Sequence, residues 1–227
     1  MVNNREIITS NEGEVFDIEL ETQILKANEE LSLENHRVMK EHEITAIDVM
    51  GSVGSGKTSI IKALISTLKT NKRIAVIEGD VTTTIDADLI ASENVPAVQV
   101  NTGKECHLDA NLIKKALTRL ELNNLDLIFI ENVGNLICPA EFPLGSDKRL
   151  VVISVTEGPY MVVKHPMMFI DANTVAINKI DLASAMEVDP SKLRNDILNI
   201  NRRGSVIPTS CKKNIGIAEI AKALGIN

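Results

Sequence analysis

Short apolar runs alternate along most of the chain with longer stretches in which apolar residues recur every three or four positions. The short runs predict β-strands, and the longer stretches predict amphipathic α-helices. Regular alternation of the two is typical of an α/β fold, a doubly wound and mainly parallel sheet with helices on both faces. Strands are expected at residues 44–50, 73–78, 97–100, 126–131, 149–155, 173–178 and 205–208, and helices at 57–70, 86–92, 107–122, 161–170, 190–202 and 215–224.

The segment before the first predicted strand has a different pattern. Residues 1–13 are polar, whereas residues 14–41 place apolar positions such as Val15, Ile24 and Leu31 among many Glu and Lys. This spacing predicts a long amphipathic helix with one break at most, packed on the domain or on a partner subunit. We therefore expect an N-terminal helical extension over residues 1–42 and an α/β domain over residues 43–227.

Composition limits the possible fold classes and the kinds of binding partner. Aromatic residues make up 2% of the chain, so the core must consist of Ile, Val, Leu and Ala, as in a covered parallel sheet. A net charge of −7 argues against a general nucleic-acid binder. No apolar run approaches the roughly 18 residues of a membrane span, and the first residues lack the apolar core of a signal peptide. Three cysteines are too few for a disulfide framework, and we expect a cytoplasmic protein with no membrane or nucleic-acid partner.

Residues 51–58 read G-S-V-G-S-G-K-T and match the phosphate-binding pattern G-x-x-x-x-G-K-S/T between a predicted strand and a predicted helix. The glycines allow backbone N–H groups to converge on an anion, and the helix N-terminus adds positive potential. Lys57 is expected to bridge the β- and γ-phosphates, and the Thr58 hydroxyl to ligate Mg²⁺. The predicted nucleotide-binding residues here are Gly51, Ser52, Val53, Gly54, Ser55, Gly56, Lys57, Thr58 and Ser59.

Acidic residues follow two other predicted strands. Glu131 ends the apolar run 127–130 in the manner of a Walker B acid, and the N–H of Gly134 can reach the γ-phosphate. The usual acid at this position is Asp, which leaves open how directly Glu131 contacts the metal. Asp80 is expected in the Mg²⁺ shell and, with Lys57, among the catalytic residues. Asp86 is either the residue that positions the attacking water or an ordinary acid in the first turn of a helix.

Two segments near the C-terminus predict the base that is bound. Asn178, Lys179 and Asp181 form N-K-x-D at the end of an apolar strand. The Asp181 carboxylate can accept hydrogen bonds from guanine N1–H and its exocyclic amine, whereas adenine offers no matching donors, so GTP is favoured over ATP. A loop similar to the Ser-Ala-Lys loop that closes over guanine follows, with Cys in place of Ala: Ser210, Cys211 and Lys212.

Cysteine and histidine gather in two segments. Cys106 and His107 precede a predicted helix, and Cys138 lies four residues after Gly134. Two thiolates and an imidazole suit Zn²⁺ or Ni²⁺, although packed cysteines and a helix-capping histidine remain an alternative. Three ligands do not complete a tetrahedral site, which favours an open transfer site or one shared across a dimer. The proximity of Cys138 to Gly134 predicts that metal and nucleotide affect each other's affinity.

Three segments resemble the HypB hydrogenase-maturation GTPases: G-D at residues 79–80, T-G-K-E-C-H-L-D-A at 102–110, and F-I-E-N-V-G-N-L-I-C-P-A at 129–140. The resemblance spans residues 40–227 and implies the SIMIBI class of P-loop NTPases, which form homodimers when GTP binds. It also implies nickel delivery to the large-subunit precursor of NiFe hydrogenase, with a HypA-type metallochaperone as partner. Cys106, His107 and Cys138 would form the metal site at the dimer interface.

The sequence also departs from that family. Upstream of Cys106 it has no cysteine and only His36 and His42, so neither a C-x-x-C-G-C nickel site nor a histidine-rich store is supported. Residues 157–166 differ from the family pattern, and we assign them no role. Alternatives are a urease-type GTPase, which would carry Pro between Cys and His, a mutase-type GTPase, which needs no such pair, and a metal-binding scaffold with structural nucleotide. A translation or signalling GTPase would usually have Asp at position 131.

Overall fold

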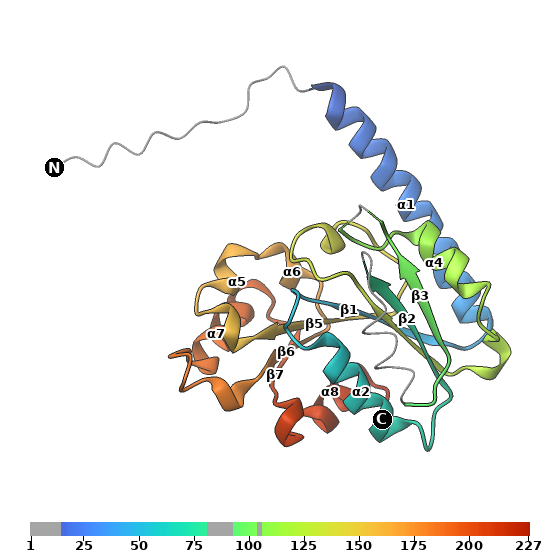
Figure 1. The fold of residues 1–227 in the computed structure, drawn as a ribbon. Helices are drawn as coiled ribbons and strands as arrows, with labels where there is room; N and C mark the ends of the chain where they lie inside the picture. The colour runs from blue at the N-terminus through green and yellow to red at the C-terminus, as the bar shows by residue number, and fades with distance from the viewer. Residues whose placement is uncertain (1–14, 81–92, 104–105) are drawn as a thin grey trace.

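The computed structural model describes residues 15–80, 93–103 and 106–227 (Figure 1). The described strands form one parallel sheet in the order β3-β2-β4-β1-β5-β6-β7, which confirms the predicted α/β architecture and the seven predicted strands. Their bounds are β1 Thr45–Met50, β2 Ile74–Asp80, β3 Ala97–Asn101, β4 Leu127–Glu131, β5 Lys148–Ser154, β6 Thr174–Asn178 and β7 Ser205–Pro208.

The described helices are α1 Val15–Glu41, α2 Lys57–Leu68, α4 Ala110–Leu117, α5 Met161–Lys164, α6 Met167–Ile170, α7 Pro190–Ile200 and α8 Ile217–Leu224. The helix predicted at 107–122 begins later because Asp109 caps it, accepting a hydrogen bond from Leu112 N at 2.7 Å. The single helix predicted at 161–170 is wrong: α5 and α6 are separate, since Pro166 has no N–H and disfavours helical geometry at His165. The helix predicted at 86–92 lies outside the described residues.

Helices cover both faces of the sheet, so successive residues of a central strand are all buried. Ile47 and Val49 of β1 pack in the core beneath α2 and α8. Ala46 and Met50 point to the opposite face, which α1 and α4 cover at one end and α5, α6 and α7 at the other (Figure 1). Burial on both sides explains why the strands read as nearly continuous apolar runs.

Helix α1 is one unbroken helix of 27 residues, and its C-terminal part lies along α4 (Figure 1). Two buried asparagines attach it: Asn28 Oδ1 accepts from Ala110 N, and Asn35 Nδ2 donates to Ala110 O, both at 2.7 Å. Asn28 also donates to Pro143 O at 2.9 Å, so α1 braces the loop before β5. Neither α1 nor another helix in the described ranges has the length and apolarity required to cross a membrane.

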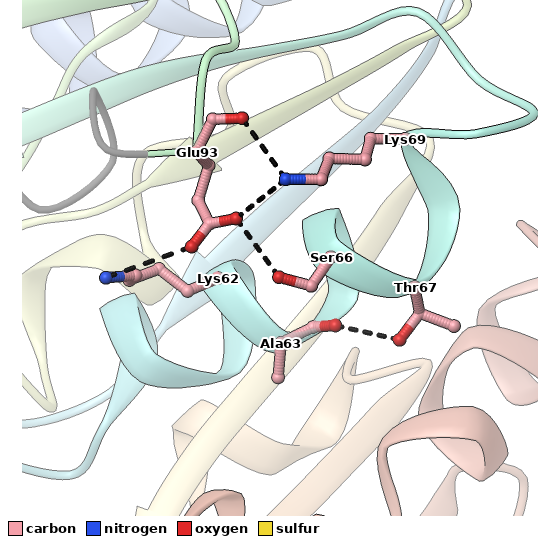
Figure 2. A network of polar contacts seen from close by, with 6 residues as sticks. All are labelled: Lys62, Ala63, Ser66, Thr67, Lys69 and Glu93. Atoms are coloured by element: carbon pink, nitrogen blue, oxygen red, sulfur yellow. Dashed lines mark hydrogen bonds and ion pairs between the residues drawn. The ribbon is translucent and has the colours of Figure 1, made fainter.

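Glu93 attaches the chain before β3 to helix α2 (Figure 2). Its carboxylate accepts from Lys69 Nζ at 3.2 Å and from Ser66 Oγ at 3.0 Å, and it lies 3.9 Å from Lys62 Nζ. Burial raises the pKa of Glu93, but these hydrogen bonds and charges outweigh it and leave the pKa below its usual value. The described chain that leads into β3 is therefore anchored to the helix that begins with Lys57.

Candidate nucleotide and metal site

The P-loop connects β1 to α2 at the carboxyl edge of the sheet, where ligands of such folds bind. Gly56 has φ 101°, a left-handed conformation, and a Cβ there would collide with the Asn178 side-chain amide. Lys57 is buried, and its Nζ donates to Gly51 O at 3.3 Å and Ser52 O at 3.2 Å. The Lys57 ammonium group is thus bound to carbonyl groups of the P-loop itself, next to the position where a phosphate would bind.

The N-K-x-D segment contacts the P-loop. Asn178 Nδ2 donates to Ser55 O at 2.9 Å, and Lys179 Nζ donates to Gly54 O at 2.6 Å. Both side chains therefore brace the P-loop from the end of β6. Lys179 also lines a cavity of about 490 Å³ together with P-loop residues and the ends of β2 and β4.

The residues predicted to hold Mg²⁺ converge in this cavity. Thr58 Oγ1, at the start of α2, donates to Glu131 Oε1, at the end of β4, at 2.7 Å. Asp80, at the end of β2, lines the same cavity. One hydroxyl and two carboxylates are hard oxygen donors and fit Mg²⁺. Asp86 lies outside the described residues.

The residues predicted to recognise the base also lie together. Asp181 Oδ1 accepts from Ser210 Oγ at 2.6 Å, which joins the loops after β6 and β7. This hydrogen bond, helped by the charges of Lys213 and Lys212, lowers the pKa of Asp181, so its carboxylate is ionised at neutral pH and able to accept. Cys211 packs against the core, and burial raises the pKa of its thiol, which fits a small packing residue.

The three predicted metal ligands lie together. The ligand atoms of Cys106, His107 and Cys138 are within 4.8 Å of one another, with 3.0 Å between the two sulfur atoms. The His107 ring stacks on Phe142 with 3.9 Å between centroids, which restricts the orientation of the imidazole. The nearby Cys106 thiol, and then burial, raise the pKa of the Cys138 thiol. Metal binding here must displace a proton, so apparent affinity should rise with pH.

Sequence reasoning missed four residues at this site: Asn132, Asn135, Phe142 and Glu157. The two asparagines stand within the E-N-V-G-N segment beside Glu131 and Gly134, a signal that could have drawn attention to them. Glu157, in the segment to which no role was assigned, caps the chain after β5 by accepting from Ser154 N at 2.9 Å. Burial raises the pKa of Glu157, and hydrogen bonds and the charges of Lys179 and Lys57 offset this only partly.

Asp48 is a buried acid beneath this edge of the sheet, and its ionisation is expected to lower the stability of the fold. Its Oδ1 accepts from Asn132 Nδ2 at 3.4 Å, and its Oδ2 lies 3.9 Å from Arg149 Nε. Burial raises the pKa of Asp48 to about 6, more than Arg149 and Asn132 lower it. The pKa of Asp48 in the native protein exceeds the ordinary value of 3.8, so protonated Asp48 stabilises the fold relative to ionised Asp48. This stabilisation is fully present below pH 4 and is lost as pH rises through 6.

We therefore expect the free energy of unfolding of Asp48→Asn, minus that of the wild type, to increase by on the order of 2–3 kcal/mol between pH 4 and pH 7. The variant side chain does not titrate, so the difference between the two proteins isolates Asp48 from the other carboxylates. Urea unfolding of both proteins at several pH values measures it. A difference that stays constant over this range would contradict the expectation.

These features place the chain among the P-loop nucleotide-binding proteins. The family model described as "CobW/HypB/UreG, nucleotide-binding domain" matches residues 45–208. The chain is 46% identical over 203 residues to "Probable hydrogenase maturation factor HypB" of Methanocaldococcus jannaschii, covering 89% of this chain and 92% of that protein. It therefore belongs to the HypB family, as the sequence resemblance predicted.

Two solved structures are also similar. The crystal structure of hydrogenase maturation factor HypB from Archaeoglobus fulgidus matches with a TM-score of 0.83 at 38% identity, over 89% of this chain and 100% of that one. The crystal structure of HypB from Helicobacter pylori in complex with nickel matches with a TM-score of 0.83 at 31% identity, over 87% of this chain and 93% of that one.

Proposed function

We propose that the protein is a GTP-hydrolysing metallochaperone that assists nickel insertion into NiFe hydrogenase during its maturation. Membership of the HypB family supports a role in hydrogenase maturation, and the nickel complex of the Helicobacter pylori relative supports nickel as the metal. The observation that carries the proposal is the short loop after β4, which joins Glu131 in the nucleotide cavity to Cys138 in the thiol cluster.

At the nucleotide, Asp181 selects guanine, and Lys57 stabilises charge on the transferred phosphate. Thr58, Asp80 and Glu131 would hold Mg²⁺, which neutralises phosphate charge when bound. Gly134 offers its N–H to the γ-phosphate, and Asp86 is proposed to position the attacking water. These roles are assigned from the residue types and from the positions of the described residues in the cavity.

At the metal, Cys106, His107 and Cys138 supply two thiolates and an imidazole, a donor set suited to nickel or zinc. We propose that two copies of the chain dock when GTP binds and that hydrolysis resets the site. A HypA-type metallochaperone and the hydrogenase large-subunit precursor are the proposed partners, and the cytoplasm is the proposed location.

We also propose that residues 43–227 constitute the GTPase domain and residues 1–42 an extension. Helix α1 ends at Glu41 and β1 begins at Thr45, which supports this boundary. The buried contacts of Asn28 and Asn35 with Ala110 indicate that the extension is packed on the domain rather than connected by a free linker.

A nickel and zinc titration tests the function. The full chain is titrated with each metal in GDP and in a non-hydrolysable GTP analogue, and light scattering gives the mass of the same samples. We expect metal affinity and mass both to change with the nucleotide, and released phosphate to require Mg²⁺ and GTP. Nucleotide binding with no response of metal affinity or mass would reject the coupled switch and leave the cysteines without this role.

A further inference from the structure

Asn135 joins the P-loop to the metal ligands. Its backbone pairs with Gly51, the first P-loop glycine, in an isolated antiparallel bridge. Its side-chain Nδ2 donates to the carbonyl oxygen of Cys106 at 3.3 Å, while its Oδ1 accepts from Ile137 N at 3.0 Å. One residue therefore contacts the phosphate loop, the backbone of one thiol ligand, and the residue before Cys138.

Asn132 makes a second connection from the same loop. It follows Glu131 directly, is 1% exposed, and its Oδ1 accepts from Leu108 N and Val133 N, both at 3.0 Å. Leu108 is the residue after His107. The backbone N–H of Leu108, next to the proposed metal ligand His107, is thus bound by Asn132, next to the proposed Mg²⁺ ligand Glu131.

Leu108 is also fixed from the other side. Its side chain is fully buried and packs against Gly79 of β2 so closely that a Cβ at Gly79 would lie 2.7 Å from it. Gly79 immediately precedes Asp80. The backbone beside His107 is therefore held between the ends of β2 and β4, the two strands that carry Asp80 and Glu131.

We infer that Asn132 and Asn135 are positioning residues that transmit the nucleotide state to the metal ligands. Asn132 lies in the closely packed interior, so it cannot shift when a γ-phosphate is bound or lost unless the backbone after His107 moves with it or the hydrogen bond to Leu108 N breaks. Asn135 is only half-buried and is connected to Cys106 by a hydrogen bond at the surface. Cys138 belongs to the same loop, three residues after Asn135, and moves with it because the two are covalently connected. The inference rests on the proposed function, since it names the contacts by which that switch reaches its metal.

The experiment measures the ratio of two nickel dissociation constants, one with GDP and one with a non-hydrolysable GTP analogue, for the full chain. Asn135→Ala removes the side-chain hydrogen bonds to Cys106 O and Ile137 N and also the contact with the Cys138 thiol, which is lost in both nucleotide states. Asn135→Asp keeps an acceptor for Ile137 N but has no donor for Cys106 O, and its added charge acts on nickel in both nucleotide states and largely cancels in the ratio. Asn199→Ala, at an exposed position of α7, is the matched control.

We expect both Asn135 variants to bring the ratio closer to one by roughly two- to tenfold, the factor that corresponds to one hydrogen bond. Asn199→Ala should keep the wild-type ratio. The reciprocal measurement is the ratio of GTP-analogue affinity to GDP affinity, with and without nickel. Its dependence on nickel must change by the same factor because the coupling free energy is shared.

Other results overturn the inference in distinguishable ways. If the Asn135 variants bind nickel more weakly by the same factor in both nucleotides, the ratio is preserved and Asn135 has only a structural role. If the wild-type ratio is itself one, the coupled switch of the proposed function fails, and the inference fails with it. Thermal unfolding of each variant establishes that the proteins compared are folded.

Discussion

The substitution Cys138→Ser is expected to weaken nickel binding by on the order of a hundredfold. Zinc sites with four ligands have apparent binding free energies of about 10–16 kcal/mol, so one ligand contributes about 3 kcal/mol. A serine hydroxyl replaces a soft thiolate with a harder and far less acidic donor at nearly the same position. Competition with a chromophoric chelator at pH 7.5 measures the dissociation constant for wild type and variant.

Cys211→Ser provides a matched control for metal affinity. Cys211, in the loop of Ser210 to Lys212, packs against the core and is not part of the cluster of Cys106, His107 and Cys138. It should leave the nickel dissociation constant unchanged. Equal loss in the two variants would show that sulfur content or folding, not the cluster, governs binding. Loss of GTP hydrolysis by metal-free Cys138→Ser would indicate a structural thiol.

The second large effect is expected from Asp181→Asn, which should weaken GTP binding by about a hundredfold or more, since sites built to hydrogen-bond a ligand strongly reject one that leaves polar groups unpaired. In the proposed role the ionised carboxylate would accept from both guanine donors, and Ser210 Oγ holds it in place at 2.6 Å. An amide presents one acceptor and one donor. It therefore repels the guanine exocyclic amine and matches xanthine, which has a carbonyl at that position.

Affinity for XTP should accordingly rise in Asp181→Asn while affinity for GTP falls, and fluorescent-nucleotide displacement measures both. The reversal of preference separates a change in base recognition from simple damage to the loop, which would weaken both nucleotides. Unchanged GTP affinity would reject the assignment of Asp181 to guanine.

The sequence predicted the elements well where the pattern is local. All seven strands are present within about two residues of their predicted ends, because apolar runs bounded by polar residues identify buried parallel strands. The error at 161–170 arose from following apolar periodicity past Pro166. The sequence contained that signal, and the rigid proline ring outweighed the periodicity.

Candidate site residues that belong to short contiguous motifs could be selected from the sequence, and the structure places the described ones close together. The P-loop and N-K-x-D each specify local geometry through residue types at fixed spacing, and the structure brings Thr58 and Glu131 together in a hydrogen bond of 2.7 Å. Asn132 and Asn135 escaped prediction because an asparagine in a loop has many possible partners. The roles proposed for them follow only from contacts with Leu108 and Cys106, residues 24 and 29 positions away in the chain.

The sequence by itself therefore determined the α/β class, the phosphate loop and the candidate ligands, since periodicity and motif spacing are properties of neighbouring residues. Only the tertiary structure decided which of these groups meet. Cys106 and Cys138 are 32 positions apart, and their sulfur atoms come within 3.0 Å because β4 lies next to β2 in the sheet and the loops after β3 and β4 share its carboxyl edge. Strand order and the packing of Leu108 against Gly79 depend on distant parts of the chain burying apolar surface together, which no local pattern encodes.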